Sequence, residues 1–245
     1  MFIWGFSAQP VYAQSELPPP TTIDYTFGGQ MNFELLVGQG SPPAEAELLF
    51  RALPDGRTTR VPATIEVLTG GGYQLSARHN LSQAAIRAFS EVEYWWRIDG
   101  LETPHATFSY RDNRYEWQSI TNQANVRVYW VEGDIEFGQT AADLAQAAFD
   151  DLSQFYTLTG DQLAPVDIYI YPDGNALRDA LWLIDREWLG GHASPEVGVA
   201  MIAIRPNNPS QAGVELAALV PRELSHLLLC RRMGASYSNL PAWLD

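Results

Sequence analysis

The sequence predicts a protein of two domains, an all-β sandwich followed by an α+β domain. Two observations support this prediction. Up to about residue 110, apolar and polar residues alternate and turn residues separate the runs, as in short antiparallel strands. Beyond about residue 125, strand patterns alternate with segments of helical period. At 245 residues, with 46% hydrophobic and 12% aromatic residues, the chain is large enough to form real cores.

The charge of the chain limits its partners. The formal net charge is −14, and all 15 basic residues are arginines because no lysine occurs. Such an acidic surface repels phosphate backbones and anionic headgroups, so we expect neither a nucleic-acid partner nor binding to a membrane surface. Cys230 is the only cysteine, which rules out an internal disulfide.

Residues 1–14 resemble a partial signal peptide. An apolar run at residues 2–6 precedes small and aliphatic residues at 11–13, and cleavage is expected after Ala13. The basic start of a signal is missing, which leaves an ordinary apolar N-terminus as the alternative. We expect export to the extracellular space or the cell envelope, with residues 15–22 as a proline-rich linker. No later stretch has the roughly 18–20 apolar residues that span a bilayer, so the mature chain is expected to be soluble, with no stable membrane span.

Residues 23–111 are predicted to form a sandwich of the immunoglobulin or fibronectin type III kind. Six or seven short strands are expected, with turns at glycine- and proline-rich segments such as residues 38–43 and 70–72. The run Glu91–Ile98 is typical of a central strand whose aromatic residues face inward. We interpret these rings as core, although an aromatic ligand-binding face is the alternative.

Residues 111–125 are polar and mark the domain boundary, and residues 122–245 are assigned to the second domain. We predict a helix capped by Thr140 and interpret the acidic residues around Gly133 as a solvated turn. The last helix is expected to end at the C-cap Gly234, and Pro221 either kinks it or starts it. The further predicted elements are strands at 126–131, 166–171 and 197–204 and helices at 176–188 and 214–233.

The last helix contains the candidate site. Glu223 and His226 lie three residues apart and share a helix face, and position 222 points the same way. A zinc peptidase helix carries two histidines at these i and i+4 positions, with a glutamate next to the first. Here Arg222 stands in the place of the first histidine.

Four segments together resemble the bacterial peptidase MA-like proteins, which are HExxH metallopeptidases of the gluzincin type. The resemblance extends from about Tyr94 onward, and its segments are Tyr-Arg-Asp-Asn-Arg-Tyr-Glu-Trp at 110–117, Gly-Gly-His-Ala-Ser-Pro at 190–195, Arg-Glu-Leu-Ser-His at 222–226 and Asn-Leu-Pro-Ala-Trp-Leu-Asp at 239–245. It implies an α+β peptidase domain that binds Zn²⁺ and hydrolyses peptide bonds, with Glu223 as catalytic base and His226 as metal ligand. It places the third ligand, a glutamate, directly after Asp245, so we expect an incomplete peptidase domain, truncated before that ligand.

Arg222 decides which function is expected. A guanidinium has no lone pair to offer and stays positively charged, so Arg222 cannot replace a histidine ligand. Glu223 itself, Cys230 or His192 could supply a donor, but each has a structural interpretation that is at least as good. Without any metal role, Arg222 and Glu223 would pair with neighbours and His226 would be a hydrogen-bonded core residue.

Three hypotheses follow. The first is an exported metallopeptidase-like protein, impaired or inactive, whose groove binds a peptide or protein ligand and whose only expected cofactor is Zn²⁺. The second is an active extracellular metallopeptidase that uses Glu223 and His226. The third is a surface adhesion module that binds through the sandwich.

Overall fold

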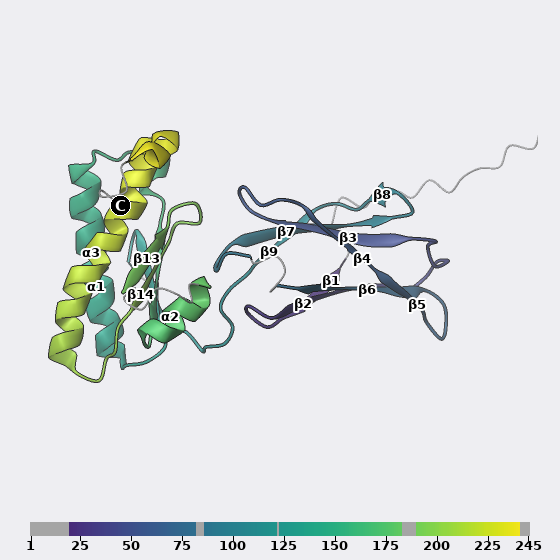
Figure 1. Cartoon of the computed structure of the whole chain (residues 1–245), viewed down its shortest axis with the longest axis horizontal. Helices are drawn as coiled ribbons and strands as arrows, with labels where there is room; N and C mark the ends of the chain where they lie inside the picture. The colour runs from purple at the N-terminus through teal and green to yellow at the C-terminus, as the bar shows by residue number, and fades with distance from the viewer. Residues whose placement is uncertain (1–19, 82–85, 122, 183–189, 241–245) are drawn as a thin grey trace, which may run out of the picture.

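The computed structural model describes residues 20–81, 86–121, 123–182 and 190–240. Figure 1 shows an elongated molecule with a β-sandwich at one end and an α/β layer at the other. The predicted signal segment, residues 1–14, lies outside the described residues, as does most of the predicted linker. In the part of the chain that the structure describes, no helix is both long and apolar enough to cross a membrane.

The N-terminal part is a sandwich of two antiparallel sheets, as predicted. One sheet has the strand order β1-β2-β6-β5, and the other has β4-β3-β7-β8, with β9 also paired to β7. This is the arrangement in which immunoglobulin-type strands A-B-E-D face C-F-G. The strands are β1 Thr21–Tyr25, β2 Gln30–Val37, β3 Ala46–Ala52, β4 Thr59–Pro62, β5 Thr64–Val67, β6 Tyr73–Asn80, β7 Glu91–Ile98, β8 Leu101–Glu102 and β9 Ala106–Ser109.

Apolar and polar residues alternate along these strands, so each strand turns its apolar side chains toward the core of the sandwich. In β2, Met31, Phe33 and Leu35 point into the core and are at most 1% exposed, while the residues between them face outward. The predicted strand 91–98 is confirmed as β7, and Trp96 is fully buried between the sheets. The prediction of six or seven strands is too low, because β4 and β5 are separate strands and β8 is only two residues long.

The C-terminal part is a five-stranded mixed sheet with helices. Its strand order is β10-β11-β12-β14-β13, in which β11, β12 and β14 are parallel and the two edge strands are antiparallel. The strands are β10 Gln118–Ile120, β11 Val126–Trp130, β12 Val166–Tyr171, β13 Gly191–Ser194 and β14 Val199–Ala203. The helices are α1 Ile135–Phe155, α2 Gly174–Leu181 and α3 Pro209–Met233, with short 3₁₀ turns η1 Gly160–Leu163 and η2 Gly234–Asn239.

Helix starts were the least accurate predictions. The helix expected from Thr140 begins at Ile135, because the Asp134 carboxylate accepts a hydrogen bond from the Phe137 amide at 2.9 Å. Thr140 lies inside this helix and donates its hydroxyl to the Glu136 carbonyl at 2.9 Å. The acidic residues around Gly133 are exposed, as expected for a solvated turn, and Asp134 in addition is the N-cap of α1.

The other helices also begin earlier than predicted. α2 begins at Gly174, because Asp173 caps it by accepting from the Asn175 and Ala176 amides. The second half of the helix predicted at 176–188 lies outside the described residues. α3 begins at Pro209 after the N-cap Asn208 and runs through Pro221 to Gly234, so Pro221 does not start the helix.

Two strands were not predicted, and two are shorter than expected, because β11 also ends one residue before the end of the predicted strand 126–131. β10 and β13 are short edge strands whose polar, glycine and alanine residues carry no alternation that sequence alone could reveal. β14 covers only residues 199–203 of the predicted strand 197–204. The predicted strand 166–171 is confirmed in full as β12.

Two buried clusters lie on opposite faces of the five-stranded sheet. One packs under α1 and α3 and includes Ile168, Ile202 and Leu224. The other fills the sandwich and continues onto the opposite face of the sheet, where it includes Tyr169 and Tyr171. The sandwich and the sheet therefore share one continuous core on the side that carries α2 (Figure 1).

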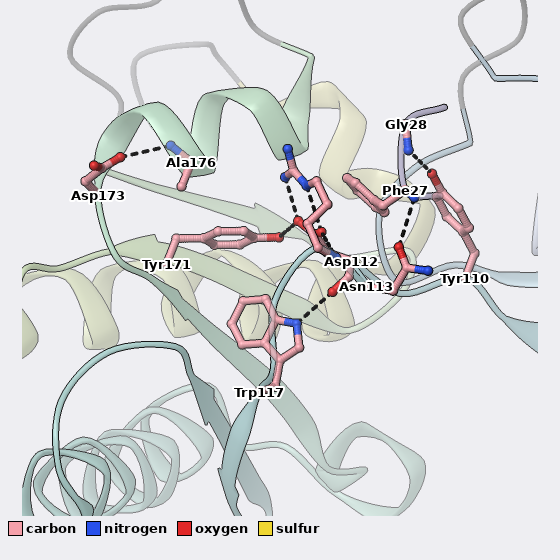
Figure 2. Close-up of polar contacts among 10 residues, drawn as sticks. Phe27, Gly28, Tyr110, Asp112, Asn113, Trp117, Tyr171, Asp173 and Ala176 are labelled. Carbon is pink, nitrogen blue, oxygen red and sulfur yellow. Dashed lines mark hydrogen bonds and ion pairs between the residues drawn. The ribbon is translucent and has the colours of Figure 1, made fainter. Parts of the chain in front are cut away.

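The connector between β9 and β10 holds the two parts together through a buried carboxylate (Figure 2). Asp112 is 0% exposed. It accepts two hydrogen bonds from the Arg114 side chain, at 2.9 and 2.6 Å, and one from the Tyr171 hydroxyl at 3.1 Å. This pairing with Asp112 raises the pKa of Arg114, so the guanidinium stays charged. Because Tyr171 belongs to β12, the network ties the connector directly to the sheet.

The same connector also binds the first turn of the sandwich. The Asn113 side chain accepts from the Phe27 amide at 2.9 Å, and the Tyr110 hydroxyl accepts from the Gly28 amide at 2.8 Å (Figure 2). Burial raises the pKa of Tyr110 to about 12, so its hydroxyl is neutral. Trp117 donates its indole N–H to the Asp112 carbonyl at 2.8 Å. Residues 110–117 therefore form a clasp, which we define as this connector with its contacts to both parts.

Phe89 is a second contact between the sandwich and the sheet. Its ring stacks on Tyr169 with 3.7 Å between the centroids, and Tyr169 in turn stacks on Tyr129 at 4.5 Å. The backbone of Phe89 has φ = 63°, a conformation that is strained for a bulky residue. The buried ring stack holds this strained backbone in place.

Replacement of Asp112 by Asn should lower the free energy of unfolding by about 3–5 kcal/mol, because it weakens three charge-assisted hydrogen bonds to a fully buried group. Tyr171→Phe should lower the free energy of unfolding by less, about 1.5–3 kcal/mol, because it removes only the hydrogen bond from the Tyr171 hydroxyl to the charged Asp112. Chemical denaturation measures both. Asp24→Asn, an exposed change on β1, is the control and should stay within about 0.5 kcal/mol. An unchanged stability of Asp112→Asn would contradict the assigned network.

Replacement of Phe89 by Gly should destabilise the protein less than replacement by Ala, by about 1 kcal/mol, because only Gly tolerates φ = 63° without strain. Both variants lose the ring stack. Phe108, which lies in the regular strand β9, is the matched control, and there Gly should be worse than Ala. Denaturation measures the stabilities of all four variants. If the Ala variant is more stable than the Gly variant at both positions, the backbone of Phe89 is not strained.

Candidate functional site

The motif helix α3 lies on the sheet face opposite the sandwich. Its buried residues recur at helical spacing, and α1 packs beside it over the same cluster. The helix is tied to α1 by a hydrogen bond of 2.8 Å between the Ser225 and Tyr156 hydroxyls. Near its end, the Arg231 guanidinium donates to the carbonyls of Ala164 and Pro165, which precede β12. These contacts fix where the motif residues stand.

Glu223 occupies a slot between α3 and β13. The residue is 2% exposed, and Gly191 of β13 lies directly against it. A Cβ atom on Gly191 would lie 2.6 Å from Glu223 Oε1, so the missing side chain makes the room for this carboxylate. The glycine of the 190–195 segment and the glutamate of the 222–226 segment are therefore one structural unit, although they are distant in sequence.

Arg222 covers this carboxylate from the solvent side. Arg222 Nη1 donates to Glu223 Oε1 at 2.9 Å, and the Arg222 side chain is 55% exposed while that of Glu223 is 3% exposed. A carboxylate this deeply buried requires a compensating cation. The arginine supplies that cation within the motif itself. His226 follows one turn later and is half-buried.

The described residues do not fit a catalytic zinc site. Such a site takes three protein ligands with lone pairs, and of positions 222 and 226 only His226 offers one. Among residues 20–81, 86–121, 123–182 and 190–240, no group of three His, Cys, Asp or Glu side chains could hold a metal ion. Residues 241–245, where the resemblance places the approach to the third ligand, lie outside this part. The catalytic role of Glu223 and the ligand role of His226 stay predictions.

The donors considered as substitutes are poorly placed. His192 pairs with Met201, which belongs to the cluster on the sandwich side, whereas Gly191 faces Glu223 on the α3 side. Because neighbouring strand residues point to opposite faces, the His192 side chain lies on the wrong face of the sheet. Cys230 is half-buried, and burial raises the pKa of its thiol, which disfavours the thiolate that binds metals. Glu223 is already engaged by Arg222.

Comparison with known proteins agrees with the class of domain that this geometry suggests. Residues 147–245 match the model of the Peptidase MA superfamily. The matched segment includes α2, α3, β12, β13 and β14 and is similar to Peptidase MA superfamily domains. The match does not extend to residues 94–146, for which the wider resemblance stays a prediction.

Two solved structures are similar to the chain. An aminopeptidase N family protein from Idiomarina loihiensis has 8% sequence identity and a TM-score of 0.35, with 84% of this chain and 46% of that chain covered. Yeast LTA4 hydrolase in complex with bestatin has 11% identity and a TM-score of 0.29, with 84% and 45% covered. The chain thus spans less than half the length of either. No curated protein matches the chain.

Replacement of Gly191 by Ala should lower the stability of the protein, because the new Cβ forces the Glu223 carboxylate out of its slot and away from Arg222. In a Glu223→Ala background the same change should be nearly neutral, which gives a coupling of about 0.5–3 kcal/mol in a double-mutant cycle. Gly213→Ala, on α3 with open space around it, is the control and should not destabilise. Equal effects of Gly191→Ala in both backgrounds would contradict the slot.

Proposed function

We propose that this chain is an exported metallopeptidase-like protein whose hydrolytic chemistry is impaired or lost and whose groove still binds peptide. The observation that supports this proposal most directly is the ion pair between Arg222 and the buried Glu223. The Peptidase MA match supports an origin from metallopeptidases and peptide as the class of ligand. Export rests on the sequence of residues 1–14.

The ion pair opposes peptidase chemistry in two ways. A guanidinium beside the motif repels a divalent cation and offers it no ligand. It also occupies the Glu223 Oε1 atom with a hydrogen bond, although a general base needs a free oxygen toward the water. Both effects come from one residue, so a single substitution can test them.

A binding role is compatible with the strand beside the motif helix. β13 ends the strand order of the sheet, so among the described residues its outer backbone edge has no strand partner. An extended peptide can add to such an edge through backbone hydrogen bonds. The edge lies next to Glu223, since Gly191 belongs to β13.

Two alternatives are separable from this proposal. An active metallopeptidase with Glu223 as base and His226 as ligand requires a further donor in place of Arg222. An adhesion module would bind through the sandwich, but the rings of β7 support it poorly because Tyr94, Trp95 and Trp96 are all buried. Binding by the sandwich without the motif domain would favour the adhesion module.

The zinc content of the natural full-length protein, measured by elemental mass spectrometry, should lie far below one ion per chain, and Arg222→His should raise it. The reason is that the histidine restores the i, i+4 pair with His226. Arg232→His, an exposed change in the last turn of the same helix, is the control and should add no zinc.

Near-stoichiometric zinc in the unchanged protein would overturn the proposal and point to an active enzyme, for which Glu223→Gln should abolish peptide hydrolysis. A folded Arg222→His variant without zinc would contradict the idea that the rest of a zinc site survives.

A further inference from the structure

A cleft of ≈ 500 Å³ lies between the sandwich and the five-stranded sheet. This volume lies within the range of small-molecule sites. The sandwich side is formed where β3 and β9 end and β7 begins, and the sheet side by β11, β12 and the turn before β14. The lining residues used below are Pro54, Glu91, Arg111, Asp167, Val197 and Val199.

Most charges in this cleft are paired within the protein. Asp167 forms an ion pair with Arg127, and Glu196 forms one with Arg87. Burial raises the pKa of Asp167, and the charges of Arg127 and Arg111 oppose that rise. The two charged groups that remain are Arg111 and Glu91.

Within the described part of the chain, Arg111 and Glu91 form no ion pair. Among the described residues, the Arg111 guanidinium forms neither an ion pair nor a hydrogen bond, since the one bond of this residue runs from its backbone N–H to the Tyr25 hydroxyl at 3.0 Å. Glu91 accepts a hydrogen bond from the Ser109 hydroxyl and, within the same described ranges, has no cationic partner. The cleft therefore contains one positive and one negative side chain that are exposed and, among the described residues, form no ion pair.

The backbone places these two groups on the same side. Glu91 and Ser109 are direct neighbours across β7 and β9. Tyr110 points into the core at 0% exposure, so Ser109 and Arg111, on either side of it, both point away from the core. Arg111 and Glu91 thus border one cleft, yet they stand too far apart for an ion pair with each other.

We propose that this cleft binds a free α-amino acid with an apolar side chain. Such a molecule carries both charges within a few atoms, so its carboxylate can accept from the Arg111 guanidinium while its ammonium group donates to Glu91. Pro54, Val197 and Val199 supply an apolar wall for the side chain. A ligand with only one charge would leave one of the two protein groups unpaired.

This proposal does not rest on the proposed function of the motif helix. Asp167, Tyr169 and Val199 belong to the sheet face that meets the sandwich, whereas Glu223 lies on the face under α3. Zinc content and amino-acid binding therefore test different sites.

Isothermal titration calorimetry of the full chain with L-valine, L-leucine and L-phenylalanine tests the proposal, and at least one of them should bind. N-acetyl-L-phenylalanine and L-phenylalanine amide, which each keep one charge, should bind at least about 10-fold more weakly than phenylalanine, because each loses a charged hydrogen bond. Arg111→Gln and Glu91→Gln should each weaken the binding of the amino acid by a similar factor.

Arg60→Gln and Glu66→Gln, exposed changes on β4 and β5 away from the cleft, are the matched controls and should leave the affinity unchanged. Thermal unfolding checks that all four variants are folded. Failure of all three amino acids to bind at millimolar concentration would overturn the proposal. So would equal binding of the singly charged analogues, or an affinity that neither Arg111→Gln nor Glu91→Gln changes.

Discussion

The buried carboxylate of Asp112 is the interaction on which the arrangement of the molecule depends. A fully buried charge is costly unless a counter-charge and hydrogen bonds compensate it, and here Arg114 and Tyr171 do both. Arg114 belongs to the connector and Tyr171 to β12, so the carboxylate has its full set of partners only when the connector packs against the sheet. The ring stack of Phe89 on Tyr169 adds apolar burial to the same contact. The shared core and the cleft beside it both follow from this docking.

A second buried carboxylate, Glu223, follows the same rule on the opposite face of the sheet. In the motif of a zinc peptidase the metal contributes positive charge close to this residue. In this chain Arg222 provides it, at 2.9 Å. An arginine at position 222 is therefore electrostatically consistent with a site without metal, because it places a positive charge beside the buried carboxylate. Arg222 thus offers no lone pair to a metal and contributes positive charge beside Glu223.

The two candidate binding regions differ in how they are built. The edge of β13 offers backbone hydrogen bonds along a strand, which suits an extended chain and gives little selectivity by charge. The cleft between the sandwich and the sheet offers two opposite charges and an apolar wall, which suits a small molecule of defined shape. The first depends on the peptidase-like domain alone. The second exists only because the clasp holds the sandwich against the sheet.

The sequence by itself determined the local features. Alternation predicted the sandwich strands, the apolar run predicted β12, and the chemistry of arginine showed that position 222 cannot bind zinc. These features depend on near neighbours or on one side chain, so a linear pattern contains them. The polar segment 111–125 was interpreted as a boundary, and residues 110–117 as part of the resemblance, but neither interpretation showed that Asp112 is one of the most buried residues.

Three features were decided only by the tertiary structure. They are the burial of Asp112, the slot that Gly191 opens for Glu223, and the sheet face on which His192 lies. Each of these depends on residues far apart in the chain that meet only after packing, since the burial of a polar side chain is set by its spatial neighbours and not by its sequence neighbours. The short strands β10 and β13 were missed for the same reason. Their pairing with β11 and β14 defines them, whereas their own residues have little preference for a strand.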